Sequence, residues 1–327
     1  MKLALSIAAL ALALASAATQ AQPSSAAAYP DRTIRLIVPL APGGSADALG
    51  RMVAKALQDR LGKPVIVDNR PGAGTTIGML AVAKAPPDGY TIGLGNIASH
   101  SLNPLLMASI PYDAARDFAP ITRVADQVAM LVVNPNKVPA TNMTELLAYA
   151  RANPGKLSFG STSSGGSTHI GMELFAAKAG IKMTHVPYKG SAPMLNDLLA
   201  GQIDLVLDPF SSSGPHVQAG KLRALGVIGP QRQFYAPELP AINEFVPGAE
   251  MVTWNGMFAP AGTPTAIVDK LATEIRAYLN EPATRDLLRK MGMTPGADSP
   301  EEFRKFIADE RARFKPVIEQ AGIRLEN

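Results

Sequence analysis

Two loops rich in glycine and hydroxyl side chains are the parts of this sequence best suited to bind a polar ligand. The first joins a short apolar run to an amphipathic segment and contains Gly43 next to Gly44. Glycines there let a ligand approach the backbone, and free N–H groups at a helix start attract an anion. A plain strand-to-helix turn is the alternative for this loop alone. Its candidate ligand-binding residues are Ala41, Pro42, Gly43, Gly44, Ser45 and Asp47.

The second loop, residues 160–168, consists entirely of glycine, serine and threonine. It offers many hydrogen-bond donors and almost no apolar bulk. A disordered linker is the alternative, but this loop runs directly from an apolar strand into a helix with an apolar face, which a linker would not do. Its candidate ligand-binding residues are Ser161, Thr162, Ser163, Ser164, Gly165, Ser167, Thr168 and the adjacent His169.

Three further residues lie at ends of expected strands. Ser99 belongs to a polar loop after one strand, and Tyr188 lies in a turn expected to border the same ligand site. Asp208 ends another strand, where its carboxylate either contacts a ligand or caps a helix. Both alternatives for Asp208 stay open.

Motifs for catalysis, metals and cofactors are weak or missing. No G-x-S-x-G nucleophile elbow occurs, and His169, two residues after Ser167, is expected to cap or pack rather than act as a base. The four histidines lack metal-ligand spacing, and the chain has no cysteine. Gly72 and Gly74 loosely resemble a dinucleotide fingerprint, but Pro71 precedes them instead of a strand. We therefore expect no enzyme activity, metal or cofactor.

The first 28 residues have the features of an export signal. Lys2 precedes an apolar stretch from Leu3 to Ala15, and small residues before positions 18 and 22 offer cleavage sites. That stretch is too short for a permanent membrane span. Without Lys2 the chain keeps 30 basic and 27 acidic residues, a net charge of about +3. Because no Lys/Arg cluster occurs, we expect no nucleic-acid partner.

Short apolar runs alternate with amphipathic stretches, which predicts largely parallel sheets with helices on both faces. Several local signals mark helix starts: Ser45 and Thr263 as N-caps, Asn142 with Glu145 as a capping box, and a second box at residues 299–302. The expected strands cover residues 33–38, 65–67, 90–95, 130–133, 203–207, 221–228 and 252–258, with one more ending at residue 186.

The last third of the chain carries long helices, which suggests that the chain returns to the domain in which it began. We predict an α/β fold of two lobes, with lobe 1 built from residues 29–128 and 252–327 and lobe 2 from residues 129–251. Ligands in open α/β sheets bind beyond the carboxyl ends of strands, and pockets favour domain interfaces. The two loops would then face each other across a cleft.

Several segments together resemble the Bug family, the periplasmic solute-binding receptors of tripartite tricarboxylate transporters. The resemblance covers nearly the whole chain after residue 28. It is carried by residues 29–32 (YPDR), 38–47 (VPLAPGGSAD), 68–74 (DNRPGAG), 83–85 (AKA), 87–90 (PDGY), 185–190 (HVPYKG), 220–225 (GKLRAL) and 260–264 (PAGTP).

The resemblance implies a Venus-flytrap fold, type II-like, in the periplasm. It also implies that the first loop and the serine-rich loop hold a ligand carboxylate through backbone groups and ordered water. The sequence departs from the family pattern in the second loop, with Ser163, Ser164 and Gly166 where the family has Gly, Asn and Ser. This departure leaves the identity of the ligand open.

We therefore expect a monomeric periplasmic binding protein for a mono-, di- or tricarboxylate, aromatic acids included. Its other partners would be the large and small membrane subunits of the permease. A periplasmic hydrolase and a ligand-sensing subunit for a membrane kinase are the alternatives.

Overall fold

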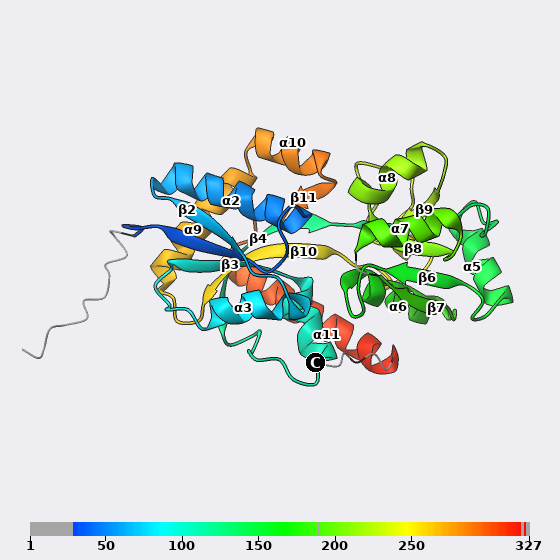
Figure 1. Ribbon diagram of the computed structural model, residues 1–327, viewed down its shortest axis with the longest axis horizontal. Helices are drawn as coiled ribbons and strands as arrows, with labels where there is room; N and C mark the ends of the chain where they lie inside the picture. The colour runs from blue at the N-terminus through cyan, green and yellow to red at the C-terminus, as the bar shows by residue number, and fades with distance from the viewer. Residues whose placement is uncertain (1–28, 189, 322–323, 325–327) are drawn as a thin grey trace, which may run out of the picture.

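Two separate β-sheets organise the chain, one in each of two lobes that lie side by side along the long axis of the molecule (Figure 1). The computed structural model describes residues 29–188, 190–321 and 324. The predicted export signal, residues 1–28, lies outside the described residues. Within the described part of the chain, no helix is both long enough and apolar enough to cross a membrane.

The sheet of lobe 1 has six strands in the order β11-β4-β10-β3-β1-β2. Helices α2 and α9 pack on one face, and helices α3 and α11 pack on the other (Figure 1). The elements are β1 (Ile34–Val38), α2 (Ser45–Leu61), β2 (Val65–Asn69), η2 (Ala73–Thr75), α3 (Thr76–Ala83), β3 (Thr91–Asn96), η3 (Ala98–Leu102), α4 (Asn103–Leu106), β4 (Phe118–Gln127), β10 (Thr253–Pro260), α9 (Thr265–Leu279), α10 (Pro282–Lys290), β11 (Met293–Pro295) and α11 (Pro300–Ala321).

The sheet of lobe 2 has five strands in the order β7-β6-β8-β5-β9. Helices α7 and α8 contribute to one apolar layer, and helices α5 and α6 contribute to the other. The elements are β5 (Ala129–Val133), α5 (Met143–Ala152), β6 (Ser158–Ser161), α6 (Ser167–Ala179), β7 (Thr184–Pro187), α7 (Ser191–Ala200), β8 (Leu205–Pro209), α8 (Phe210–Gln218), β9 (Arg223–Val227) and η4 (Ile242–Glu244).

Both sheets are mixed, so the prediction of largely parallel sheets was wrong. Strands β1, β2 and β3 are parallel, but β10 runs antiparallel to both β3 and β4, and β5 runs antiparallel to both β8 and β9. The reason lies in how the chain moves between lobes. Strand β4 carries the chain out of lobe 1, and its neighbour β10 carries the chain back in. These two strands must therefore run in opposite directions.

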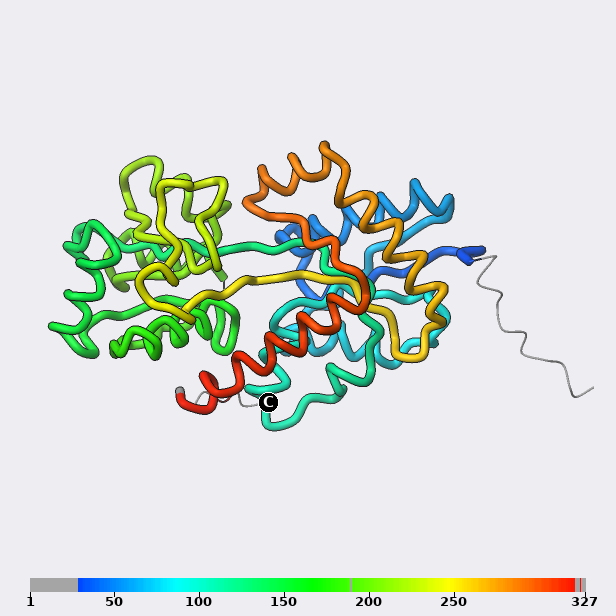
Figure 2. The backbone as a smooth tube through the Cα atoms, turned by 180° about the vertical axis from the view of Figure 1, so that it is seen from behind, coloured from blue at the N-terminus to red at the C-terminus, as the bar shows by residue number. Residues whose placement is uncertain are grey.

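The two crossings are short, and a helix reinforces them. Only Val128 separates β4 from β5, and Met251 and Val252 lead into β10. Figure 2 shows these two connections running between the lobes. Helix α11 also contacts both lobes, because it packs against β4 and η3 in lobe 1 and against α6 in lobe 2.

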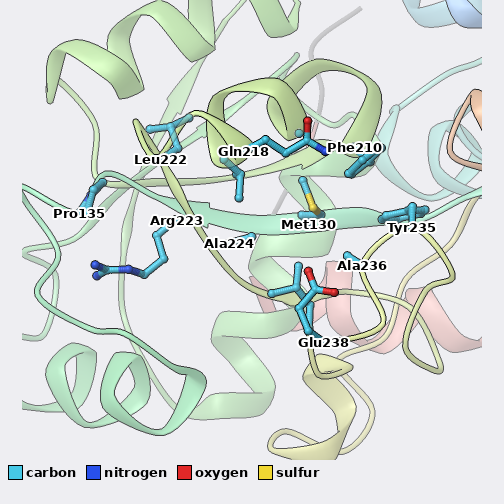
Figure 3. Close-up of a pocket in the computed structure, with 14 residues that line it drawn as sticks. Met130, Pro135, Phe210, Gln218, Leu222, Arg223, Ala224, Tyr235, Ala236 and Glu238 are labelled. Atoms are coloured by element: carbon cyan, nitrogen blue, oxygen red, sulfur yellow. The ribbon is translucent and has the colours of Figure 1, made fainter.

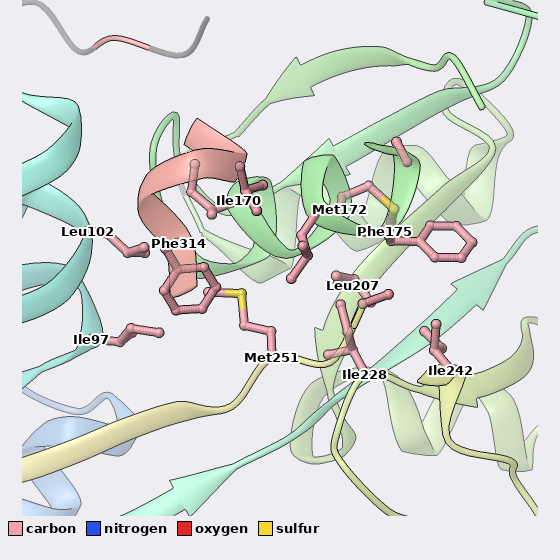
Figure 4. Close-up of a cluster of buried hydrophobic side chains, with 14 of the residues drawn as sticks. Ile97, Leu102, Ile170, Met172, Phe175, Leu207, Ile228, Ile242, Met251 and Phe314 are labelled. Atoms are coloured by element: carbon pink, nitrogen blue, oxygen red, sulfur yellow. The ribbon is translucent and has the colours of Figure 1, made fainter. Parts of the chain in front are cut away.

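An apolar cluster continues from one lobe into the other along the side where α11 lies (Figure 4). Ile97 and Leu102 enter it from lobe 1, Ile170 enters it from α6, and the fully buried Phe314 of α11 lies between them. Met251, on the second crossing, completes it. The lobes therefore share packed side chains on this side, and any relative motion must turn about it.

Local signals placed most helix starts to within a residue. The capping box at Asn142 is confirmed, since the N–H of Glu145 donates to Asn142 Oδ1 at 3.0 Å, and the box at Ser299 is confirmed by its hydrogen bonds with Glu302. Ser45 and Thr263 were wrong as N-caps, because the caps are Gly44 and Pro264. The Thr263 hydroxyl instead donates to the carbonyl of Pro260 at 2.8 Å. The polar loop expected around Ser99 forms the short π-helical turn η3.

Candidate functional site

A cavity of about 410 Å³ lies between the lobes and takes lining residues from both. Among the described residues that line it, none carries a charged side chain. The lining residues from lobe 1 are Pro39, Leu40, Ser45, Gly72, Gly74, Thr75, Asn96, Ala98 and Asn103, and those from lobe 2 are Thr162, Ser163, Ser164, Gly165, Gly166 and Ser167.

Two helices, one from each lobe, begin at this cavity. Ser45 is the first residue of α2 and Ser167 is the first residue of α6, and both line the cavity. The cap residues are Gly44 and Gly166, both with extended backbones and neither with a side chain that could satisfy the first N–H groups. The positive ends of two helix dipoles therefore meet at one cavity, an arrangement that favours an anion.

The first loop is held by a buried carboxylate. Asp47 accepts hydrogen bonds from Arg51 Nε at 3.0 Å, from the N–H of Gly43 at 3.0 Å and from Asn69 Nδ2 at 2.9 Å. These three donors, with Arg51 first, lower the pKa of Asp47 to about 2. Gly43 has the left-handed φ of +88°, and its N–H is already engaged. The Gly43 N–H is therefore not among the free N–H groups expected in this loop, and those that remain belong to the start of α2.

The second loop is held by two stacked histidines. The N–H of Gly165 donates to His169 Nδ1 at 3.0 Å, and the His169 ring stacks on His185 at 3.7 Å between centroids. Burial, together with His185, lowers the pKa of His169 to about 4, so the ring is neutral near pH 7 and can accept this bond. The Ser161 hydroxyl lies 2.6 Å from His185 Nε2 and donates to the carbonyl of Ser163. His169 packs, as the sequence predicted.

The threonines of this loop join its two ends. The N–H of Thr162 donates to Thr168 Oγ1 at 3.0 Å, and the two hydroxyls lie 3.1 Å apart. Thr168 is buried behind the loop, whereas Thr162 lines the cavity. The loop is thus braced from behind and presents its front to the cavity.

The structure brings only part of the predicted site together. Six of the predicted residues line the cavity: Ser45, Thr162, Ser163, Ser164, Gly165 and Ser167. The others are absent from the described lining: Ala41, Pro42, Gly43, Gly44, Asp47, Ser99, Ser161, Thr168, His169, Tyr188 and Asp208.

Ser99 and Tyr188 have partners elsewhere in the protein. Ser99 is fully buried, and its hydroxyl accepts from the N–H of Asn96 at 2.9 Å and lies 2.8 Å from His100 Nδ1. The Tyr188 hydroxyl donates to Asp197 at 2.8 Å, and burial together with Asp197 raises the pKa of Tyr188 to about 12.

Asp208 is fully buried at the end of β8. Its carboxylate accepts from the hydroxyl of Ser191 at 2.6 Å and from the hydroxyl of Ser212. Burial raises the pKa of Asp208 despite these donors. Because Ser191 begins α7 and Ser212 lies in α8, Asp208 ties these two helices together. It caps neither of them, since the N-caps are Gly190 and Pro209, and its contact with a ligand stays a prediction.

Residues of lobe 1 that the sequence did not single out complete the lining. Asn96 ends β3 and lines the cavity; its Oδ1 accepts from the N–H of Ser99 at 3.1 Å. Asn103 donates to the carbonyl of Gly74 at 2.8 Å. Thr75 has the unusual φ of +82° and a buried hydroxyl with no partner among the described residues. Asn96 could have been predicted from its place as a polar residue at a strand end. No local sequence signal predicts the positive φ of Thr75.

The site offers hydrogen-bond donors that suit an anion. Within the described residues, no group of three or more His, Asp or Glu side chains could hold a metal ion. The only histidine of the two loops, His169, is braced inside the second loop. The arrangement therefore fits the binding of an anion.

Comparison with known proteins gives a consistent result. The family described as the tripartite tricarboxylate transporter family receptor, TctC, matches residues 49–323. The structure is similar to that of R. palustris Rpa4515 with adipate, with 38% identity, a TM-score of 0.81 and coverage of 91% of this chain and 100% of that one. It is also similar to the periplasmic binding protein BugD (32%, TM-score 0.76, coverage 91% and 100%). A third similar structure is MatC from Rhodopseudomonas palustris with bound malate (27%, TM-score 0.75, coverage 89% and 100%).

Proposed function

The chain belongs to the tripartite tricarboxylate transporter receptor family, and on that premise we propose that it captures a small organic carboxylate in the cavity between its lobes. Members of this family are transport receptors, so the chain is a solute-binding protein and not an enzyme. The hydrolase alternative is therefore set aside.

The convergence of two helix starts on one uncharged cavity carries this proposal. Backbone N–H groups of α2 and α6 meet the anion, and the hydroxyls of Ser45 and Ser167 add donors beside them. Because the helices come from opposite lobes, a dicarboxylate can place one carboxylate at each start. Adipate in Rpa4515 and malate in MatC are both dicarboxylates, which supports this class of ligand.

We infer that the cavity-lining hydroxyls and Asn96 supply the side-chain contacts. The contributing hydroxyls are those of Ser45, Thr162, Ser163, Ser164 and Ser167. The predicted residues outside the lining hold the loops in position, Asp47 for the first loop and His169 for the second. This division of roles rests on the hydrogen bonds described above.

The remaining expectations extend this proposal. We place the lobe boundaries at residues 128/129 and 251/252 and the mature protein in the periplasm, as a monomer, with residues 1–28 as its signal peptide. The ligand-bound form would be handed to the large and small membrane subunits of the permease.

A thermal-shift screen of mono-, di- and tricarboxylates, aromatic acids included, tests the proposal. Ligand binding to the folded state stabilises it by RT ln(1 + [L]/Kd), about 2.7 kcal/mol at a hundredfold excess over Kd. We expect dicarboxylates to give the largest shifts and to be recovered unchanged. If no acid shifts the melting temperature while an ester is hydrolysed, the proposal is wrong.

Small-angle scattering tests whether the lobes close on the ligand. A carboxylate that touches both helix starts favours the arrangement in which they are nearest. The radius of gyration should therefore fall when a saturating dicarboxylate is added. An unchanged profile at saturation would show that the cavity is already in its binding form.

A further inference from the structure

A second cavity, of about 350 Å³, lies within lobe 2 and shares no described lining residue with the cavity between the lobes (Figure 3). It lies between α8, strands β5 and β9, and the segment from residue 235 to residue 239. Its volume is within the range of small-molecule sites. The lining residues are Met130, Pro135, Phe210, Gly214, Val217, Gln218, Gly220, Leu222, Arg223, Ala224, Tyr235, Ala236, Glu238 and Leu239.

The floor and one wall of this cavity suit a flat apolar group. Met130 is 1% exposed and lies in Figure 3 between the two aromatic residues of the wall and the rest of the lining, so it forms part of the floor. Phe210 and Tyr235 form the wall, with ring centroids 4.7 Å apart and planes inclined by 31°. Aromatic rings and a methionine sulfur make favourable contacts with another aromatic ring.

Contacts from outside hold this wall in place. A Cβ added at Gly292, in lobe 1, would lie 3.6 Å from Cβ of Phe210, so Phe210 packs against the backbone of the other lobe. The Tyr235 hydroxyl donates to the carbonyl of Val128 at 2.7 Å. The wall is therefore formed before any ligand arrives, which lowers the cost of binding.

One charged group at the cavity remains without a partner. Arg223 donates to the carbonyl of Ala140 at 3.0 Å, and Figure 3 shows its guanidinium pointing away from the centre of the cavity. Glu238 lies at the opposite side in Figure 3, and its carboxylate has no hydrogen bond or ion pair with any residue that the structure describes. A negative charge beside an aromatic wall favours a ligand that combines a flat apolar body with a cation.

We propose that this second cavity binds a small arylalkylamine, with its ring against Phe210 and Tyr235 and its ammonium group at Glu238. This ligand class is opposite in charge to the carboxylate of the interlobe cavity. The inference rests on the second cavity alone and does not depend on the proposed function.

Calorimetry on the full mature chain tests the proposal with 2-phenylethylamine and its neutral analogue 2-phenylethanol. Because the ammonium–carboxylate pair is partly exposed to solvent, we expect the amine to bind about two- to fivefold more tightly than the alcohol. Glu238→Gln should abolish this difference. Glu319→Gln removes the same charge from an exposed position of α11 and should preserve it.

Blocking variants locate the site. Val217→Trp introduces an indole into the lining from a partly exposed position of α8 and should prevent binding of both probes. If circular dichroism shows that Val217→Trp does not fold, Gln218→Trp, at an exposed position on the rim of the cavity, replaces it as the blocking variant. Carboxylate affinity should stay within twofold in all variants, so failure here leaves the proposed function untouched.

Three results would overturn the inference. They are no saturable binding of the amine to the wild type, equal affinity of the wild type for both probes, and wild-type affinity in a folded blocking variant. The last result would place the amine elsewhere on the protein.

Discussion

Ser45→Asp separates the stability of the fold from binding of the anion, because the two should change in opposite directions. Ser45 is the first residue of α2 and lines the cavity between the lobes. A carboxylate in the first turn of a helix is favourable by about 0.3–1 kcal/mol. The same carboxylate adds a negative charge to the cavity in which we place the ligand. We therefore expect a slightly higher melting temperature together with weaker carboxylate binding.

The size of the cavity sets the expected loss. A sphere of about 410 Å³ has a diameter of about 9 Å, so a ligand carboxylate lies about 5 to 9 Å from a charge on its wall. With an effective dielectric constant of about 20, the repulsion is about 3.3 kcal/mol at the shorter distance and about 1.8 kcal/mol at the longer one. Affinity should then fall about 20- to 250-fold.

Calorimetry with adipate measures the loss, and two variants control for size and charge. Ser45→Asn has nearly the same shape without the charge and should bind at least tenfold more tightly than Ser45→Asp. Thr265→Asp places the same charge at the first residue of α9, outside the described lining, and should bind normally. Equal losses for Asp and Asn would indicate steric exclusion, and normal binding by Ser45→Asp would refute an anion site at this helix.

Three other substitutions test separate parts of the structure. Gly44→Ala should keep the fold, because Gly44 has a φ of −85° and its added Cβ would lie 3.9 Å from the carbonyl of Ala41. Gly44 is the N-cap of α2, so the added methyl group lies next to the first N–H groups of the helix, where we place the ligand carboxylate. Calorimetry should therefore show a ten- to hundredfold loss of carboxylate affinity, about the value of one charge-assisted hydrogen bond, and normal binding would make the loop only a turn. Burial raises the pKa of Asp126 in the folded protein to about 6, above the unfolded value near 4. The contribution of Asp126 to stability is therefore complete below pH 4, where the carboxyl is protonated in both states, and is lost as pH rises through about 6. In urea titrations, Asp126→Asn should have the same free energy of unfolding as the wild type at pH 4 and a value about 1–3 kcal/mol higher at pH 8; equal stabilities at both pH values would contradict the raised pKa. Phe314→Ala should cost about 3–5 kcal/mol in the same assay, and a loss below 1 kcal/mol would show that the cluster shared by the lobes is not well packed.

The sequence predicted the two loops because their signals are local. Each loop follows an apolar strand and precedes a helix with an apolar face within about ten residues, so composition and spacing are sufficient to place it. Strand β4 escaped prediction because its sequence contains Pro120 and lacks clean alternation. Its partners β10 and β11 lie more than a hundred residues away along the chain, and pairing over that distance leaves no local pattern.

The roles of buried carboxylates could not be read from the sequence. Asp47 and Asp208 both stand next to expected loops or strand ends, where a carboxylate commonly serves function. Whether such a group faces a ligand or the protein depends on which donors surround it. Each has a donor four residues away, Arg51 for Asp47 and Ser212 for Asp208, but the others come from other elements: Asn69 for Asp47, and Ser191 for Asp208. A buried carboxylate needs such partners to avoid a large desolvation cost.

Part of the departure of the second loop from the family pattern is explained by the contact between positions 163 and 166. A Cβ at Gly166 would overlap the hydroxyl of Ser163, so a side chain at position 166 requires the Ser163 side chain to move or to be absent. The resemblance implies glycine at position 163 and serine at position 166 in the family, the reverse of this chain. The exchange keeps one side chain in the shared space and transfers a hydroxyl from the cap of α6 to the loop. The first N–H groups of α6 keep their position, so we expect the exchange to change which ligand groups find a hydroxyl partner and not whether the helix start attracts an anion.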